Sequence, residues 1–210
     1  MSPDWIDVSR ILDERTPVWP CDRPFTLCTR LEDRMTVTHL ATTCHVGTHV
    51  ETGLHVVAGL PALDSVPLTV LCGPAEVVHP ATGGPVVRVE DLPRGWSPAA
   101  PRVLIRTGTF PAGTSSIGSG FAGLSPALVD HLAARGVLLV GIDTPSVDPM
   151  EAEDLPAHRA LARHGLVWIE GLDLEVAGPG TYEMVALPLP LAGTEAAPAR
   201  VLLRCARLGS

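Results

Sequence analysis

The stretch that decides the fold class is SPALVDHLAARGVLLVGI, residues 125–142. Ser125 is a typical helix cap, and Pro126 suits the first helical turn, so a helix is expected to begin here. The apolar run Val137–Ile142 that follows is typical of a buried strand. The same order recurs in PAHRALARHGLVWIEG, residues 156–171. A helix followed directly by an apolar strand, twice over, indicates an α/β protein.

Working outward from these two units, we expect few helices and many short strands. The helices are Ser125–Arg135, which Gly136 can end, and Pro156–Arg163, which Gly165 can end after His164. Prolines and glycines separate short apolar or alternating runs, which predict a mixed sheet. The predicted strands are Trp5–Ser9, Met35–Thr43, His45–Val50, Glu76–His79, Val86–Val89, Arg102–Arg106, Val137–Ile142, Val167–Gly171, Tyr182–Pro188 and Arg200–Ala206. We find no internal repeat and no change of composition, so a single domain over residues 1–210 is predicted.

Composition excludes several classes of partner. Hydrophobic residues make up 46% of the chain, enough for a folded core, and the formal charge is -8 with no basic run. A nucleic-acid partner is therefore not expected. No apolar run reaches the ~18 residues of a membrane helix, and the N-terminus lacks a signal-peptide pattern, so a cytoplasmic location is expected. Five cysteines without CxxC spacing predict reduced thiols.

The segment HVGTHVETGLH, residues 45–55, concentrates metal-binding residue types. Its β-branched interior favours a strand, and a central glycine costs a helix roughly 1 kcal/mol. On a strand, His45, His49 and Glu51 point to one face, and Gly47 between them leaves room for an ion. The pattern predicts a metal site. The alternatives are a helical histidine pair, as in zinc proteases, and a polar strand with solvated histidines.

Residues in other elements can complete such a site. His158 lies in the predicted helix Pro156–Arg163, and Glu170 follows three apolar residues, where a carboxylate is costly to bury without a partner. The alternatives are an exposed histidine and a glutamate at the solvent edge. Asp143 leaves the carboxyl end of an apolar strand, a usual place for function. It can orient a ligand or cap a turn, and we favour the turn.

Five segments of the chain are informative together: IDVSRILDERTPVWPCD, HVGTHVETGLH, GIDTPSVDP, AHRALARHGLVWIEGL and YEMVALPL. They resemble the bacterial kynurenine formamidases (arylformamidases) of the cyclase-like metal-dependent hydrolase family. The resemblance covers nearly the whole chain in the right order. It implies that family's α/β fold, a single mixed-sheet, swivelling β/β/α barrel-like domain, commonly assembled as a homodimer. The implied reaction is hydrolysis of a small aryl formamide, N-formyl-L-kynurenine, to L-kynurenine and formate in tryptophan degradation.

Carried over position by position, the resemblance makes His45, His49 and Glu51 ligands of one divalent metal. Glu51 then also bridges to a second metal held by His158 and Glu170. Two zinc ions per subunit are expected, although histidine and carboxylate ligands also suit manganese or iron.

The resemblance also assigns two further roles. His55 matches the family's general acid/base, and an unperturbed pKa of ~6.5 suits proton transfer in both directions. Trp19 matches an aromatic residue that contacts the substrate; the alternative is plain core packing.

Three residues depart from the family pattern. Glu51 stands where Asp is usual, which moves the carboxylate by roughly 1.5 Å, whereas metal distances tolerate only about 0.2 Å. Gly53 replaces Pro and is expected to loosen the loop that aims His55. Cys21 replaces Gly and is expected to add a thiol near the pocket. The alternative functions are therefore hydrolysis of another cyclic or aryl amide such as isatin, a catalytically degenerate metal-binding protein, and a structural zinc site.

Overall fold

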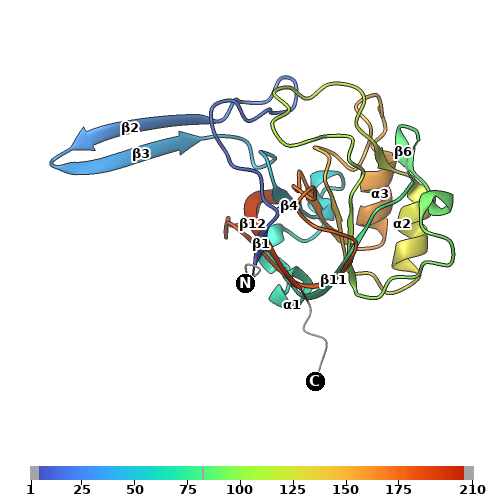
Figure 1. Ribbon diagram of the computed structural model, residues 1–210. Coiled ribbons are helices and arrows are strands. Elements are labelled where there is room, and N and C mark those ends of the chain that lie inside the picture. The colour runs from blue at the N-terminus through green and yellow to red at the C-terminus, as the bar shows by residue number, and fades with distance from the viewer. Residues whose placement is uncertain (1–4, 82, 206–210) are drawn as a thin grey trace.

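Seven strands close into a barrel (Figure 1). The computed structural model describes residues 5–81 and 83–205. The barrel order is β12-β11-β5-β7-β9-β10-β4, with β4 pairing back to β12, and β1 extends the sheet beyond β12. Neighbours among β5, β7, β9 and β10 are parallel and the other pairs are antiparallel, which confirms the mixed α/β fold. The strands are β1 Ile6–Asp7, β4 His49–Glu51, β5 Cys72–Val78, β7 Arg102–Ile105, β9 Leu139–Ile142, β10 Val167–Glu170, β11 Gly180–Pro188 and β12 Ala196–Cys205.

Two apolar clusters stabilise the barrel from its two sides. Side chains from all seven strands fill the inside, and a second cluster lies between the strands and helices α2 (Pro126–Ala133) and α3 (Pro156–Arg163). Alternation along β10 shows the division, since Ile169 belongs to the inner cluster and Trp168 to the outer one. Burial on both faces explains why these strands read as continuous apolar runs.

The structure confirms most predicted elements and corrects several boundaries. Helix α3 has the predicted bounds, whereas α2 ends two residues before Arg135. The predicted strand His45–Val50 is wrong at its start, because β4 begins only at His49. Ala206, the predicted end of the last strand, lies outside the described residues. The sequence prediction missed α1 (Leu68–Leu71), β2 (Thr26–Glu32), β8 (Gly123–Leu124), which pairs with β6 (Val86–Val87), and the 3-10 helices Gly53–His55, Leu63–Ser65 and Val89–Asp91.

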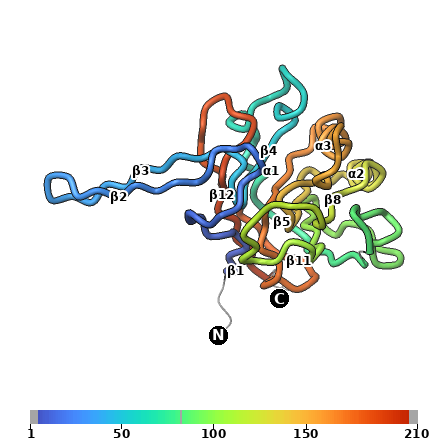
Figure 2. The backbone as a smooth tube through the Cα atoms, turned by 90° about the horizontal axis from the view of Figure 1, so that it is seen from above, coloured from blue at the N-terminus to red at the C-terminus, as the bar shows by residue number. Residues whose placement is uncertain are grey.

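A long hairpin projects from the barrel (Figures 1 and 2). It consists of β2 and β3 (Met35–Ala41), and we call it the arm. The two residues that join the strands, Asp33 and Arg34, both have positive φ angles, as a tight two-residue hairpin turn requires. All of β2 is exposed, so the arm makes little contact with the barrel. Among the described helices, none is long and apolar enough to cross a membrane.

Candidate metal centre

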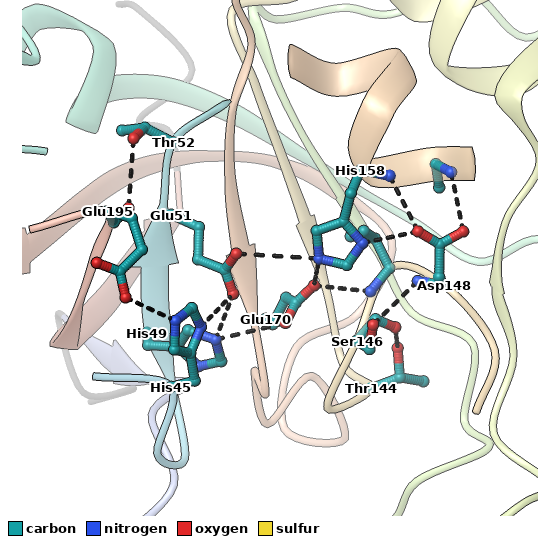
Figure 3. A network of polar contacts seen from close by, with 12 residues as sticks. His45, His49, Glu51, Thr52, Thr144, Ser146, Asp148, His158, Glu170 and Glu195 are labelled. Atoms are coloured by element: carbon teal, nitrogen blue, oxygen red, sulfur yellow. Dashed lines mark hydrogen bonds and ion pairs between the residues drawn. The ribbon is translucent and has the colours of Figure 1, made fainter. Parts of the chain in front are cut away.

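The five predicted ligands come together beside the carboxyl end of β10 (Figure 3). Strands β4 and β10 pair antiparallel with His49 directly opposite Glu170, so backbone register alone places these two side chains together. Helix α3 brings His158 to the same place. His49, Glu51, His158 and Glu170 are each at most 3% exposed.

Glu51 lies at the middle of the group. Its Oε1 is 2.7 Å from His49 Nε2 and 3.0 Å from His45 Nδ1, and its Oε2 is 3.9 Å from His158 Nε2. The carboxylate of Glu170 lies 3.4 Å from His49 Nε2 and 3.3 Å from His158 Nε2. Three imidazoles therefore face two buried carboxylates.

These residues fit a divalent cation. Among the described residues, Glu51 Oε2 is buried without a hydrogen-bond partner, which is costly for a carboxylate unless a cation compensates it. Potential ligand atoms of His49, Glu51 and Glu170 all lie within 4.8 Å of one another, and so do those of His45, Glu51 and His55. Glu51 belongs to both sets, as a bridging ligand would. Histidine and carboxylate are the donor types that zinc, manganese and iron accept.

Two of the histidines are oriented by hydrogen bonds on their far side. His49 Nδ1 lies 3.0 Å from Gly47 O, and His158 Nδ1 lies 2.7 Å from Asp148 Oδ2. A proton on each Nδ1 leaves the Nε2 lone pair facing the carboxylates, which is the usual arrangement of metal-binding histidines. Asp148 also accepts from the backbone N–H groups of Ala157 and His158, so it fixes the start of α3. The sequence analysis missed Asp148, because nothing in its local pattern connects it with a helix several residues further on.

The segment that carries His45 is a turn and not a strand, which corrects the predicted role of Gly47. Gly47 has φ +58°, and a Cβ there would lie 2.4 Å from Leu12 Cδ2. The glycine is therefore needed for the turn and its packing, and not to leave room for an ion. A Cβ atom added at Gly171, which follows Glu170, would lie only 2.2 Å from Gly47 O, so the two backbones are in contact.

A cavity of about 400 Å³ opens onto four of the five predicted ligands, all except His49. His55 is exposed in its wall, with its ring centroid 4.5 Å from that of His45 and 5.5 Å from that of His158. Trp19 also lines the cavity and meets Phe121 edge-on at 6.4 Å between ring centroids, so it is not simply a core residue.

Residues outside the predicted set complete the cavity wall. Glu195, which no sequence pattern singled out, lies with its Oε1 3.0 Å from His45 Nε2. Asp22 and three apolar side chains also line the cavity; these are Ile117, Pro145 and Leu155.

Three further residues singled out in the sequence are Asp143, Cys21 and Gly53. Asp143 accepts hydrogen bonds from the backbone N–H groups of Thr107 and Gly108. It therefore holds the loop that follows β7, which is distant in the sequence, and not the turn after its own strand. Cys21 has φ +76° and is exposed, and the described lining of the cavity does not include it. A Cβ atom added at Gly53 would lie 3.1 Å from Ala162 Cβ on α3. This glycine therefore permits close packing at the start of the turn that carries His55.

The protonation of the group reflects its burial and its charges. Burial alone raises the pKa of Glu51, but hydrogen bonds from His45 and His49 reverse this and hold it well below its ordinary value. His55 behaves differently, since the protein around it lowers its pKa by desolvation more than the nearby carboxylates raise it. His55 is therefore mainly neutral at pH 7, whereas at His45, His49 and His158 the neighbouring carboxylates outweigh burial and raise the pKa above its ordinary value.

Comparison with known proteins identifies the family of the chain and proteins that share its fold. Residues 6–149 match the model of the putative cyclase family. A potential metal-dependent hydrolase with cyclase activity is 29% identical, with 95% of this chain and 96% of that chain covered and a TM-score of 0.83. A predicted metal-dependent hydrolase from Bacillus stearothermophilus is also 29% identical, with coverages of 95% and 97% and a TM-score of 0.81. Isatin hydrolase A from Labrenzia aggregata, at 21% identity, coverages of 95% and 92% and a TM-score of 0.81, shares the fold. Because the family model spans more than half of the sequence, the chain belongs to the putative cyclase family.

Proposed function

We propose that the protein is a metal-dependent amide hydrolase that converts N-formyl-L-kynurenine and water to L-kynurenine and formate. The observation that carries the proposal is the buried group around Glu51, with one carboxylate oxygen lacking a hydrogen-bond partner among the described residues, beside a cavity of about 400 Å³. Two similar solved structures at 29% identity are described as a potential and a predicted metal-dependent hydrolase, which supports the reaction class.

The proposed ligands are His45, His49 and Glu51 for one zinc ion, and Glu51, His158 and Glu170 for a second. A bound divalent cation would lower the pKa of a water from ~16 to about 7 and polarise the formyl carbonyl. Glu51 converges with one ligand of each proposed zinc ion, because potential ligand atoms of His49, Glu51 and Glu170 all lie within 4.8 Å of one another. This supports Glu51 as the ligand that the two sets share.

The other residues of the cavity would bind the substrate and move the proton. Trp19 offers a flat face for the aryl ring, and Leu155 and Ile117 exclude water around it. His55 is neutral at pH 7 and exposed to the cavity, so a ring nitrogen can take the proton of the attacking water. The same nitrogen can then deliver that proton to the departing aniline nitrogen.

A two-substrate assay tests the proposal. Zinc-loaded protein is expected to hydrolyse N-formylkynurenine much faster than isatin. Turnover of isatin alone would instead assign the cavity to cyclic amides. Bound metal without hydrolysis of either compound would identify a catalytically degenerate member.

The metal-free protein is expected to release protons when zinc binds. Burial lowers the pKa of His49, but Glu170 and Glu51 more than reverse this and raise it to about 10; Asp148 and Glu170 likewise raise that of His158 to about 10. A ligand imidazole must be neutral, so below pH ~10 the cation has to displace these protons, and zinc affinity falls as the pH falls. Calorimetric titrations near neutral pH, in buffers of different ionisation enthalpy, measure the release. A binding constant that is independent of pH would contradict the prediction.

We propose further that the arm binds a second copy of the chain. One face of the arm carries no charged side chain. It is formed by the cross-strand pairs Leu27–Leu40, Thr29–Thr38 and Leu31–Thr36. Leu31 is 77% and Leu40 62% exposed, and a lone two-stranded hairpin is marginally stable in water. An uncharged face is complementary to its own copy about a two-fold axis.

Light scattering after size exclusion tests the arm. The unaltered protein is expected to be a dimer, and a Leu31→Asp, Leu40→Asp variant a monomer. Arg30→Ala changes the opposite face and is expected to leave the dimer intact. A monomeric unaltered protein, or a dimeric aspartate variant, would contradict this interface.

A further inference from the structure

We propose that Glu195 is a positioning residue, which holds the ring of His45 so that Nδ1 faces Glu51 and the cation. This inference rests on the metal binding in the proposed function, but not on the identity of the substrate.

The ring of His45 lies between two carboxylates (Figure 3). Its Nδ1 is 3.0 Å from Glu51 Oε1, and its Nε2 is 3.0 Å from Glu195 Oε1. A neutral imidazole carries one N–H and one lone pair, and an ionised carboxylate can only accept. When a cation sits against Glu51, the proton of His45 therefore belongs on Nε2, where Glu195 accepts it, and the Nδ1 lone pair is left for the metal.

The backbone of Glu195 is tied to the ligand segment. Its carbonyl accepts the backbone N–H of Thr52 at 3.0 Å, and the Thr52 hydroxyl at 3.3 Å. The next residue, Ala196, is the partner of Glu51 in the pairing of β12 with β4. The pairing that closes the barrel thus sets the distance between Glu195 and the metal-binding motif.

Glu195 also completes a pattern that the other two histidines show. His49 is held through Nδ1 by Gly47 O, and His158 through Nδ1 by Asp148 Oδ2. His45 lies in the turn before β4, outside the strand that carries His49. Among the described residues, Glu195 is the only hydrogen-bond partner of its Nε2.

Zinc affinity of the metal-free protein tests the role through two substitutions. Glu195→Ala removes the acceptor and is expected to weaken zinc binding by about 10- to 100-fold. Glu195→Gln retains an oxygen that can accept the Nε2 proton, so it is expected to bind zinc nearly as tightly as the unaltered protein. Glu183→Ala removes an exposed carboxylate that pairs with Arg204, and it serves as the matched control with unchanged affinity. Circular dichroism of each metal-free variant confirms that the fold is retained.

A spectroscopic measurement separates positioning from general support. Long-range ¹H–¹⁵N correlation spectra of the zinc-loaded protein are expected to show the His45 proton on Nε2. A proton on Nδ1 would overturn the proposal, as would an alanine variant with unaltered affinity. Equal losses in the alanine and glutamine variants would make Glu195 a ligand, which also overturns it. Failure of the unaltered protein to bind any divalent metal would refute the proposed function itself, and this inference with it.

Discussion

A Glu51→Gln variant is expected to lose most of its bound metal and roughly 10³-fold in kcat/KM for N-formylkynurenine. Glu51 belongs to both groups of converging ligand atoms, and its two oxygens face different histidines. Glutamine keeps the shape but removes the charge, and it presents an NH₂ group to one of the imidazole nitrogens. Elemental analysis of the purified protein measures the metal content directly.

A Glu51→Asp variant sharpens this test, because the resemblance leads us to expect aspartate here in related proteins. In this chain the contacts of 2.7 and 3.0 Å to His49 and His45 are made by the longer side chain. Withdrawing the carboxylate by roughly 1.5 Å is therefore expected to weaken metal binding here. Glu175→Gln, an exposed change outside the cavity lining, is the control. A fully loaded Glu51→Gln protein would show that the metal binds elsewhere.

The parts of the structure that sequence predicts best are those with local causes. Helix α3 has the predicted bounds, because proline favours its first turn and Gly165 adopts the left-handed conformation that ends it. The apolar runs at β9 and β10 identify strands that are buried on both faces. The histidines and glutamates of the site were identifiable because burying such groups without partners is costly.

The parts that sequence misses depend on contacts between distant segments. Strand β2 is exposed along its whole length, so it lacks the one-sided pattern of a buried face. Glu195 reaches His45 only because β12 pairs with β4, across 150 positions of the chain. The turn at Gly47 is set by Leu12 and by the backbone at Gly171, and neither contact is visible in the motif itself.

A His55→Ala variant is expected to retain its metal while kcat falls by about 10²- to 10⁴-fold, the usual contribution of a general acid/base. His55 lies exposed in the cavity wall, and its ring centroid is 4.5 Å from that of His45 and 5.5 Å from that of His158. Desolvation lowers its pKa below the ordinary 6.5, so the ring is neutral and can accept a proton at pH 7. As the pH falls through this lowered value, the ring becomes protonated and kcat is expected to decline. In the pH profile of the variant, this decline of kcat at low pH is expected to be absent.

Metal content and turnover must be measured on the same preparation, because His55 also belongs to a group of converging ligand atoms with His45 and Glu51. If His55 is a ligand, His55→Ala lowers zinc content and turnover together, and the acid/base role is wrong. If turnover survives with full zinc content, neither role holds. His131→Ala, on α2 and outside the cavity lining, is the matched histidine control and is expected to change neither quantity. Only loss of turnover with zinc retained places the proton transfer on His55.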